Sequence, residues 1–68
     1  MNGTISRLTP ERRFGFIRGE DGKRYVFHRS ELRGGLQFDE LREGQHVVFE
    51  PRQAESGSRA TEISPAAA

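Results

Sequence analysis

Short runs in which apolar and polar residues alternate organise this chain. Such alternation, combined with β-branched and aromatic side chains, is typical of strands that bury one face. The strands that it predicts span residues 3–8, 13–18, 24–28, 46–50 and 59–63. Because no segment reads as a convincing helix, and because closure removes exposed sheet edges, the pattern favours a closed or partly closed barrel.

The segments between these runs are rich in turn formers. Thr9-Pro10-Glu11 ends the first strand, and residues 19–23, with Asp21-Gly22, join the second strand to the third. Turns of this length favour antiparallel neighbours, so the first three strands are expected to form a meander. We expect one helical turn at residues 30–32.

Three polar segments are predicted to be irregular. Residues 33–40 are too polar and glycine-rich to continue a helix, and residues 52–58 have no apolar periodicity, so both are expected to be loops, the second a mobile one. Residues 64–68 offer only small side chains for burial. The sequence therefore predicts one domain, residues 1–63, followed by a flexible tail, residues 64–68.

Length and cysteine content restrict the class of protein. A chain of 68 residues can hold one small core. Without cysteine it has neither a disulfide nor a thiolate metal site, and nothing points to an oxidising compartment. No leader-like segment or membrane-spanning stretch is found, so a cytoplasmic protein is expected, neither secreted nor membrane-embedded.

Charge is unevenly distributed although the net charge is only +1. Residues 1–33 carry eight cations and four acids, whereas residues 34–68 carry three cations and six acids. Ten of the eleven cations are arginine, whose planar guanidinium binds phosphate through two N–H groups and stacks on bases. The first half of the chain is therefore the candidate surface for a nucleic acid, although arginine as the habitual surface cation would give the same composition.

Phe14 and Phe16 form the most informative pair. Residues two apart in a strand point to the same face, so the two rings share one surface, while Ile17 is suited to the core. His28 lies on the same face of the next strand if Tyr25 and Phe27 fill the core. The three side chains then make a platform on which bases can stack; the alternative places one of the rings in the barrel core.

Phe38 is a large ring in a polar loop, where it either binds a ligand or anchors the loop. No catalytic residues are predicted: His28 and Ser30 lack a third group at suitable spacing, and Ser30 is better explained as a helix cap. No metal site is predicted either, because His46 is the only other histidine. No cofactor is expected, and glycine-rich nucleotide-binding loops are missing.

Two motifs, Arg13-Phe14-Gly15-Phe16-Ile17 and Tyr25-Val26-Phe27-His28-Arg29-Ser30, resemble the RNA-binding motifs of the bacterial cold-shock domain. The likeness continues through Phe38, the turn Leu41-Arg42-Glu43-Gly44-Gln45, Val47 to Glu50, and residues 59–63. This resemblance implies an all-β, five-stranded antiparallel OB-type β-barrel. It also implies binding of single-stranded RNA or DNA by a monomer that acts as an RNA chaperone in the stress response, without ATP.

Ten positions are predicted to bind nucleic acid: Arg7, Arg12, Arg13, Phe14, Phe16, Val26, His28, Arg29, Phe38 and Arg59. The resemblance implies that Phe14, Phe16, His28 and Phe38 keep the family's stacking chemistry and that Arg12 keeps the cation before the first motif. Four of the ten depart from the family pattern: Arg7 replaces the usual tryptophan, Arg13 a glycine, Val26 a phenylalanine, and Arg29 an aromatic residue of many members. Three rings are therefore lost and three arginines gained. Binding is expected to depend more on phosphate contacts, and the alternative is a small barrel that has become a protein-interaction module.

Overall fold

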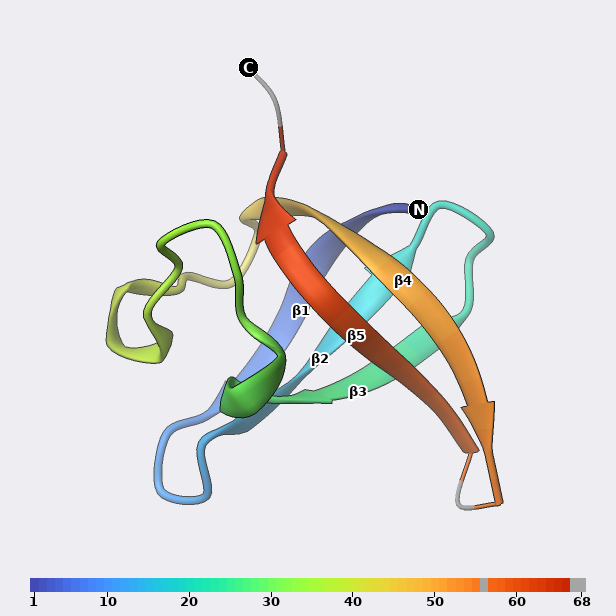
Figure 1. Cartoon of the computed structure of the whole chain (residues 1–68), viewed down its shortest axis with the longest axis horizontal. Helices are drawn as coiled ribbons and strands as arrows, with labels where there is room; N and C mark the ends of the chain where they lie inside the picture. Colours follow the sequence, from blue (N-terminus) through green and yellow to red (C-terminus); the bar gives the residue numbers. More distant parts are fainter. Residues whose placement is uncertain (56, 67–68) are drawn as a thin grey trace.

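The structure is a computed structural model, which describes residues 1–55 and 57–66. Five strands form a closed barrel in the order β1-β2-β3-β5-β4 (Figure 1). Their bounds are β1 Asn2–Thr9, β2 Phe14–Gly19, β3 Arg24–His28, β4 His46–Ala54 and β5 Gly57–Pro65. The five-stranded OB-type barrel that the sequence predicts is confirmed.

β1, β2 and β3 form the predicted antiparallel meander, and β4 pairs antiparallel with both β1 and β5. Among the described pairings, the one between β3 and β5 is parallel, and it joins Val26 to Arg59. This parallel pair closes the barrel. It is the exception to the antiparallel arrangement that was expected.

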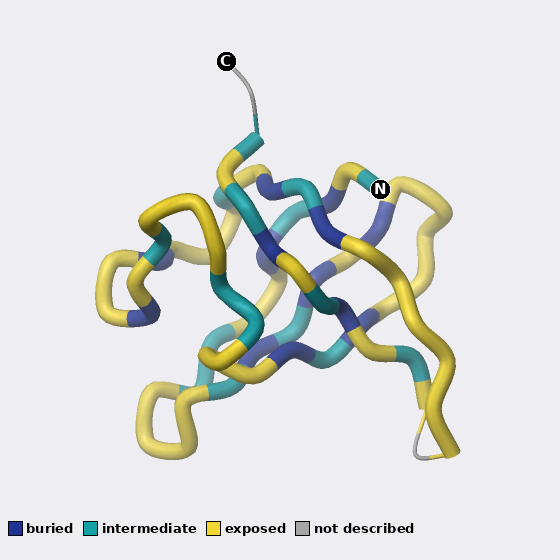
Figure 2. The backbone as a smooth tube through the Cα atoms, viewed as in Figure 1, coloured by how far each residue is buried: buried dark blue, intermediate teal, exposed yellow. Residues whose placement is uncertain are grey.

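The core is built from the alternation along the strands. Ile5, Ile17, Val47, Phe49 and Ile63 are at most 1% exposed, and buried positions alternate with partly buried or exposed ones along the barrel (Figure 2). Tyr25 and Phe27 also lie inside, as predicted. Alternating buried side chains in β2, β3 and the first half of β4, with Ala60 and Ile63 from β5, thus explain why the chain closes around this core.

The hairpin of β4 and β5 is longer than predicted. Arg52, Gln53 and Ala54 pair with Arg59, Ser58 and Gly57, so the expectation of a mobile loop over residues 52–58 is wrong for the described part, and residue 56 lies outside the described residues. The sequence signal is missing because these side chains are exposed. Backbone pairing, rather than a buried face, holds this end of the hairpin.

Two short 3₁₀ helices interrupt the segment between β3 and β4. Helix η1, Arg29–Glu31, agrees with the expected helical turn, while η2, Phe38–Glu40, lies where only a loop was expected. Ser30 is not the cap of η1, because the His28 side chain accepts the Ser30 backbone N–H. The predicted role of Ser30 as a helix cap is therefore wrong.

The end of the chain is more ordered than predicted. Ser64 and Pro65 belong to β5 and pair with Val48 and Val47, and the Ala66 backbone N–H donates to the His46 carbonyl at 3.4 Å. β5 thus extends two residues beyond residue 63, where the sequence placed its end. Residues 67 and 68 lie outside the described residues.

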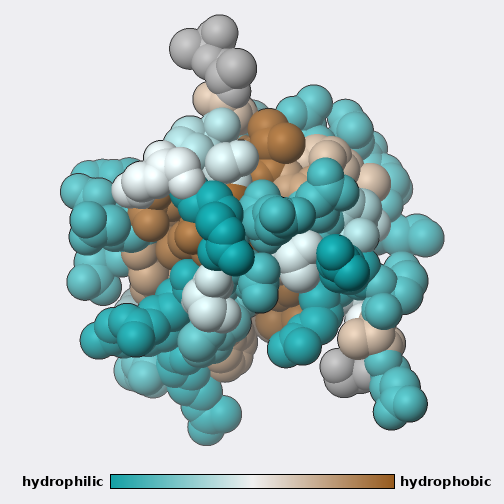
Figure 3. All heavy atoms as spheres, viewed as in Figure 1, coloured by the Kyte–Doolittle hydropathy of each residue, from teal (hydrophilic) through white to brown (hydrophobic). Residues whose placement is uncertain are grey.

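On the face shown in Figure 3, where β4 and β5 lie in front, hydrophilic side chains prevail and hydrophobic ones show only in small patches. The described residues include no large hydrophobic side chain that is fully exposed. They also contain no helix that is long and apolar enough to cross a membrane.

Candidate nucleic-acid interface

Cross-strand pairing places the predicted site residues in rows on the outer face of the meander. One row joins Thr9, Phe14 and His28 across β1, β2 and β3. A second row, two residues further along β2, joins Arg7, Phe16, Val26 and Arg59 across β1, β2, β3 and β5. Six of the ten predicted positions are thus neighbours in space, although they are spread over 53 positions of the chain, from residue 7 to residue 59.

The two rings of β2 lie as the alternation predicts. Phe14 and Phe16 are partly buried on the outer face while Ile17 is fully buried. Their ring centroids are 6.0 Å apart and the planes meet at 83°, an edge-to-face arrangement that aromatic pairs favour. The alternative in which one of them completes the core is therefore wrong.

Gly15 keeps the two rings in this position. A Cβ atom at Gly15 would lie 2.6 Å from the Arg7 carbonyl oxygen and 2.9 Å from the Phe27 ring. Contacts this short are not tolerated, so any side chain here would push β2 away from β1 or from the core. The glycine between the two phenylalanines is thus required by the close approach of strands and core.

His28 is exposed at the end of β3 and its orientation is fixed locally. Its Nδ1 accepts the Ser30 backbone N–H at 3.2 Å and lies 3.2 Å from the Ser30 Oγ. Because Nδ1 accepts a hydrogen bond, we assign the proton of the neutral ring to Nε2. His28 therefore offers an N–H donor to a ligand on the outer face.

Phe38 does not form an exposed platform. It is 8% exposed, and its ring centroid lies 6.3 Å from that of Phe27. Of the two alternatives for this residue, loop anchoring describes its position. Stacking on a base would require η2 to move away from the core.

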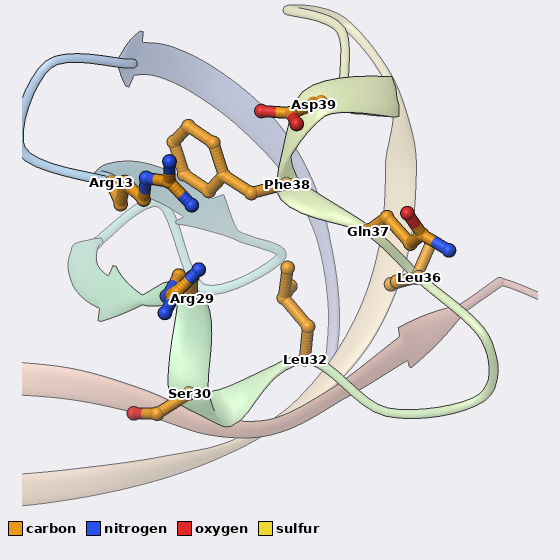
Figure 4. Close-up of a pocket in the computed structure, with 8 residues that line it drawn as sticks. All are labelled: Arg13, Arg29, Ser30, Leu32, Leu36, Gln37, Phe38 and Asp39. Carbon is orange, nitrogen blue, oxygen red and sulfur yellow. The ribbon is translucent and has the colours of Figure 1, made fainter.

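Phe38 nevertheless borders a cavity of about 400 Å³ together with two arginines. Figure 4 shows Arg13 and Arg29 on one side of this cavity, with Leu32 and Leu36 across from them and the Phe38 ring turned toward Arg13. The Arg29 backbone N–H donates to the Arg13 carbonyl at 3.0 Å, which holds the two arginines next to each other. Two guanidinium groups at an open cavity favour an anionic ligand.

Arg13 has an unusual backbone conformation. Its φ angle is 57°, in the left-handed region that a side chain makes costly by roughly 1–2 kcal/mol. Its N–H donates to the Thr9 carbonyl at 2.9 Å, so the tight turn between β1 and β2 requires this conformation. A residue other than glycine at this position therefore adds a cation at the expense of local strain.

The other predicted residues differ in their surroundings. Arg7 is exposed where β1 changes register, and Arg59 is exposed beside Val26, which is partly buried. Arg12 lies in the turn after β1 and borders none of the cavities beside Phe38 and Phe16. Arg12 thus lies neither in the two cross-strand rows nor at these two cavities.

Two residues of this face were missed by the sequence analysis. The Arg24 guanidinium carbon lies 5.3 Å from the Phe16 ring centroid, and Arg18 is the cross-strand partner of Arg24. The signal was available, because Arg18 is two residues after Phe16 and Arg24 is two residues before Val26. The parity that predicted the rings also places these arginines on the outer face.

An acid and a phenol interact at the far end of β3, in the turn before it. The Tyr25 hydroxyl donates to Asp21 Oδ2 at 2.6 Å, and the Lys23 backbone N–H donates to Asp21 Oδ1 at 3.0 Å. These hydrogen bonds, the first above all, hold the pKa of the Asp21 carboxyl below its ordinary value. The same bond to Asp21 raises the pKa of Tyr25.

Residues 1–55 and 57–66 contain no group of three His, Asp or Glu side chains that could hold a metal ion.

Comparison with known proteins agrees with this geometry. The family model described as the 'Cold-shock' DNA-binding domain matches residues 1–66. Cold shock protein 2 of Lactiplantibacillus plantarum is 38% identical over 64 residues, covering 94% of this chain and 96% of that protein. The probable cold shock protein A of Mycolicibacterium smegmatis is 42% identical over 62 residues, with 90% of this chain and 91% of that protein covered.

A solved structure supports the same conclusion. The structure described as drosophila Unr CSD456 superimposes with a TM-score of 0.72 at 28% sequence identity. The match covers 97% of this chain but 26% of that longer chain. With its OB-type barrel, its outward rings and a family match over residues 1–66, the chain belongs to the cold-shock domain family of nucleic-acid-binding proteins.

Proposed function

We propose that this chain binds single-stranded RNA or DNA across the outer face of β1, β2 and β3. The observation that carries the proposal is the placement of Phe14, Phe16 and His28 on one face, bordered by guanidinium groups. Rings stack on any base, which contributes about 1–3 kcal/mol per base. The arginines hold the phosphate backbone, which fixes the strand in place without reading its sequence.

An RNA chaperone activity follows from this mode of binding. A protein that holds unpaired strands favours the open form of a structured RNA by mass action, in proportion to the strand that it binds. The proposed mechanism needs no nucleotide hydrolysis. RNA and DNA differ little as partners of a surface that contacts ring faces and phosphates, so both are proposed ligands.

The arginines gained at positions 7, 13 and 29 predict strong salt dependence. For single strands the slope of log affinity against log salt is about 0.7 per phosphate that is neutralised. We therefore expect a slope of about 2 or steeper, which corresponds to three or more ionic contacts. Fluorescence anisotropy of a labelled single-stranded oligonucleotide, titrated at several salt concentrations, measures this slope.

The matched control is a duplex of the same sequence, whose bases are stacked and unavailable to the rings. Preference for the single strand, together with a steep slope, is the expected outcome. A nearly flat slope would contradict the role of the arginines, and equal affinity for the duplex would contradict the role of the rings. Binding of neither nucleic acid would favour the second candidate, a protein-interaction module.

The second candidate depends on the loss of three rings from the family pattern at Arg7, Val26 and Arg29. A protein partner is usually held by an apolar patch with a polar rim. The described residues leave no large hydrophobic side chain fully exposed, which disfavours an apolar docking surface on this barrel. Nucleic-acid binding is therefore the function that the geometry supports best.

A further inference from the structure

A second cavity opens at the end of the outer face that lies away from Phe38. It has a volume of about 470 Å³, and its lining consists of Ser6, Arg7, Phe16, Arg18 and Arg24. Three guanidinium groups from three different strands thus meet around a single ring. Two of them, Arg18 and Arg24, belong to neither of the motifs that carry the family resemblance.

This arrangement of charge is unfavourable in the free protein. Arg18 and Arg24 are direct cross-strand partners, and like charges at such positions repel each other. The hydrogen bonds found among residues 1–55 and 57–66 join none of the three guanidiniums to a carboxylate. The cavity lining contains no carboxylate, so an anion from outside the chain would relieve the repulsion.

Arg24 is also positioned for a ligand by its contact with Phe16. Its guanidinium carbon lies 5.3 Å from the ring centroid, within the distance at which a cation is attracted to an aromatic face. This contact restricts a long side chain that would otherwise move freely.

We propose that Arg7, Arg18 and Arg24 form a phosphate-binding site beside Phe16, and that this site holds a phosphate group of the bound single strand. The proposal rests on the function proposed above and assigns two further binding residues to it, Arg18 and Arg24. Planar guanidiniums bind phosphate oxygens through paired N–H donors. The strand is thus held by charge at this end of the face, next to the stacking surface of Phe14, Phe16 and His28.

The test compares two variants that lose the same charge. Arg18→Gln/Arg24→Gln removes two arginines from the cavity, whereas Arg42→Gln/Arg52→Gln removes two exposed arginines that border neither this cavity nor the one beside Phe38. Anisotropy titrations with a labelled single-stranded oligonucleotide should show binding about tenfold weaker for the first variant than for the second. The slope of log affinity against log salt should be smaller for the first variant than for the second by about 0.7, the value for one neutralised phosphate.

The phosphate has two possible sources, an internal linkage or a 5′ end. Oligonucleotides with a 5′-phosphate or a 5′-hydroxyl separate them, as does a series in which one internal phosphate at a time is replaced by a neutral methylphosphonate. Neutralising the phosphate that occupies the site should weaken binding by the wild-type protein but not by Arg18→Gln/Arg24→Gln. Either source supports the site.

Equal affinity and equal salt slopes for the two double variants would overturn the proposal. This outcome differs from failure of the proposed function, in which the wild-type protein itself binds no single strand. The cavity variant should be at least as resistant to thermal unfolding as the wild type, because it removes a like-charge pair. If the cavity variant does not fold, Arg18→Lys/Arg24→Lys replaces it, because lysine keeps the charge but lacks the paired N–H donors. The proposal would then be overturned if this lysine variant bound every oligonucleotide as tightly as the wild type does.

Discussion

The two faces of β2 and β3 carry similar residues but have different roles. On the inner face Ile17, Tyr25 and Phe27 are at most 3% exposed and pack against the rest of the barrel. On the outer face Phe14 and Phe16 are only partly buried, and His28 is exposed. Because alternate residues of a strand point to opposite sides, a shift of one position decides whether a ring builds the fold or remains available to a ligand.

The comparison also separates stability from binding. Residues of the inner face are buried in the core, whereas those of the outer face are partly buried or exposed, which leaves the outer face freer to change. This freedom explains how arginines can stand at positions 7, 13 and 29 without loss of the barrel. The outer face is therefore where substitutions can alter binding without loss of the fold.

The largest expected effect comes from truncating a ring on the inner face. Phe27→Ala removes a buried ring that packs near Phe38, and such truncations lower the free energy of unfolding by about 3–5 kcal/mol. This is a large share of the stability of a small domain. Chemical denaturation should show a variant that is mostly unfolded or close to it.

The matched control for Phe27→Ala is Val26→Ala, which truncates the neighbouring side chain on the outer face. Val26 is only partly buried, so we expect a loss of about 1 kcal/mol or less. A loss as large as that of Phe27→Ala would mean that the outer face is also part of the core, and the comparison of the two faces would fail.

A smaller effect is expected at Arg13, where the outer face carries strain. Arg13→Gly and Arg13→Ala both remove the guanidinium, but only glycine relieves the left-handed conformation at φ 57°. The free energy of unfolding of the glycine variant should therefore be about 1 kcal/mol higher than that of the alanine variant. Both variants should bind a single strand more weakly than the wild type, and to the same extent.

Thermal unfolding and anisotropy on the two Arg13 variants check both halves of this prediction. Equal stability of the glycine and alanine variants would show that the turn does not impose the strain. Unchanged affinity in both variants would remove Arg13 from the interface. If Arg13→Gly is more stable than the wild type but binds the strand more weakly, then Arg13 contributes to ligand binding at a cost in stability.

The smallest effect concerns the turn between β2 and β3, away from the aromatic face. The folded protein lowers the pKa of Asp21, so the ionised carboxylate stabilises the fold above its ordinary pKa, near 4, and this contribution is lost as the pH falls through the lowered value. Asp21→Asn should therefore be less stable than the wild type near pH 7. The difference should vanish in acid.

Thermal unfolding of both proteins from about pH 7 to about pH 2 follows this difference. The hydrogen bond also raises the pKa of Tyr25, so its contribution is present below the ordinary phenol pKa and is lost as the pH rises through the raised value. A difference between the proteins that stays constant over the acid range would contradict the role of the Tyr25–Asp21 hydrogen bond. Affinity for a single strand should be the same in both proteins at neutral pH.

The sequence predicts the parts of the fold that bury a side chain at every second position. The strand of residues 24–28 is predicted with its correct bounds, and the inward and outward directions of Phe14, Phe16 and Ile17 follow from parity alone. The end of the β4–β5 hairpin is not predictable in this way, because backbone pairing holds exposed polar side chains there. Periodicity has no signal where neither face is buried.

The same alternation along the strands predicts part of the candidate site, but not all of it. The motifs around Phe14 and His28 identify the face, but Phe38 lies in a loop whose fold depends on the core beneath it. Arg18 and Arg24 share the parity of the rings, yet their convergence on Phe16 depends on the register between β2 and β3. Register between strands is set by the whole sheet rather than by either strand alone.

The role of the outer rings is tested most directly by the affinity of Phe14→Ala/Phe16→Ala for a labelled single-stranded oligonucleotide. The label must be on the nucleic acid because the chain has no tryptophan. We predict that the folded variant binds at least about 30-fold more weakly than the wild type, as expected from the loss of two stacked rings. A variant that keeps its cooperative thermal unfolding and binds the strand as tightly as the wild type would contradict the claim that these rings hold the bases.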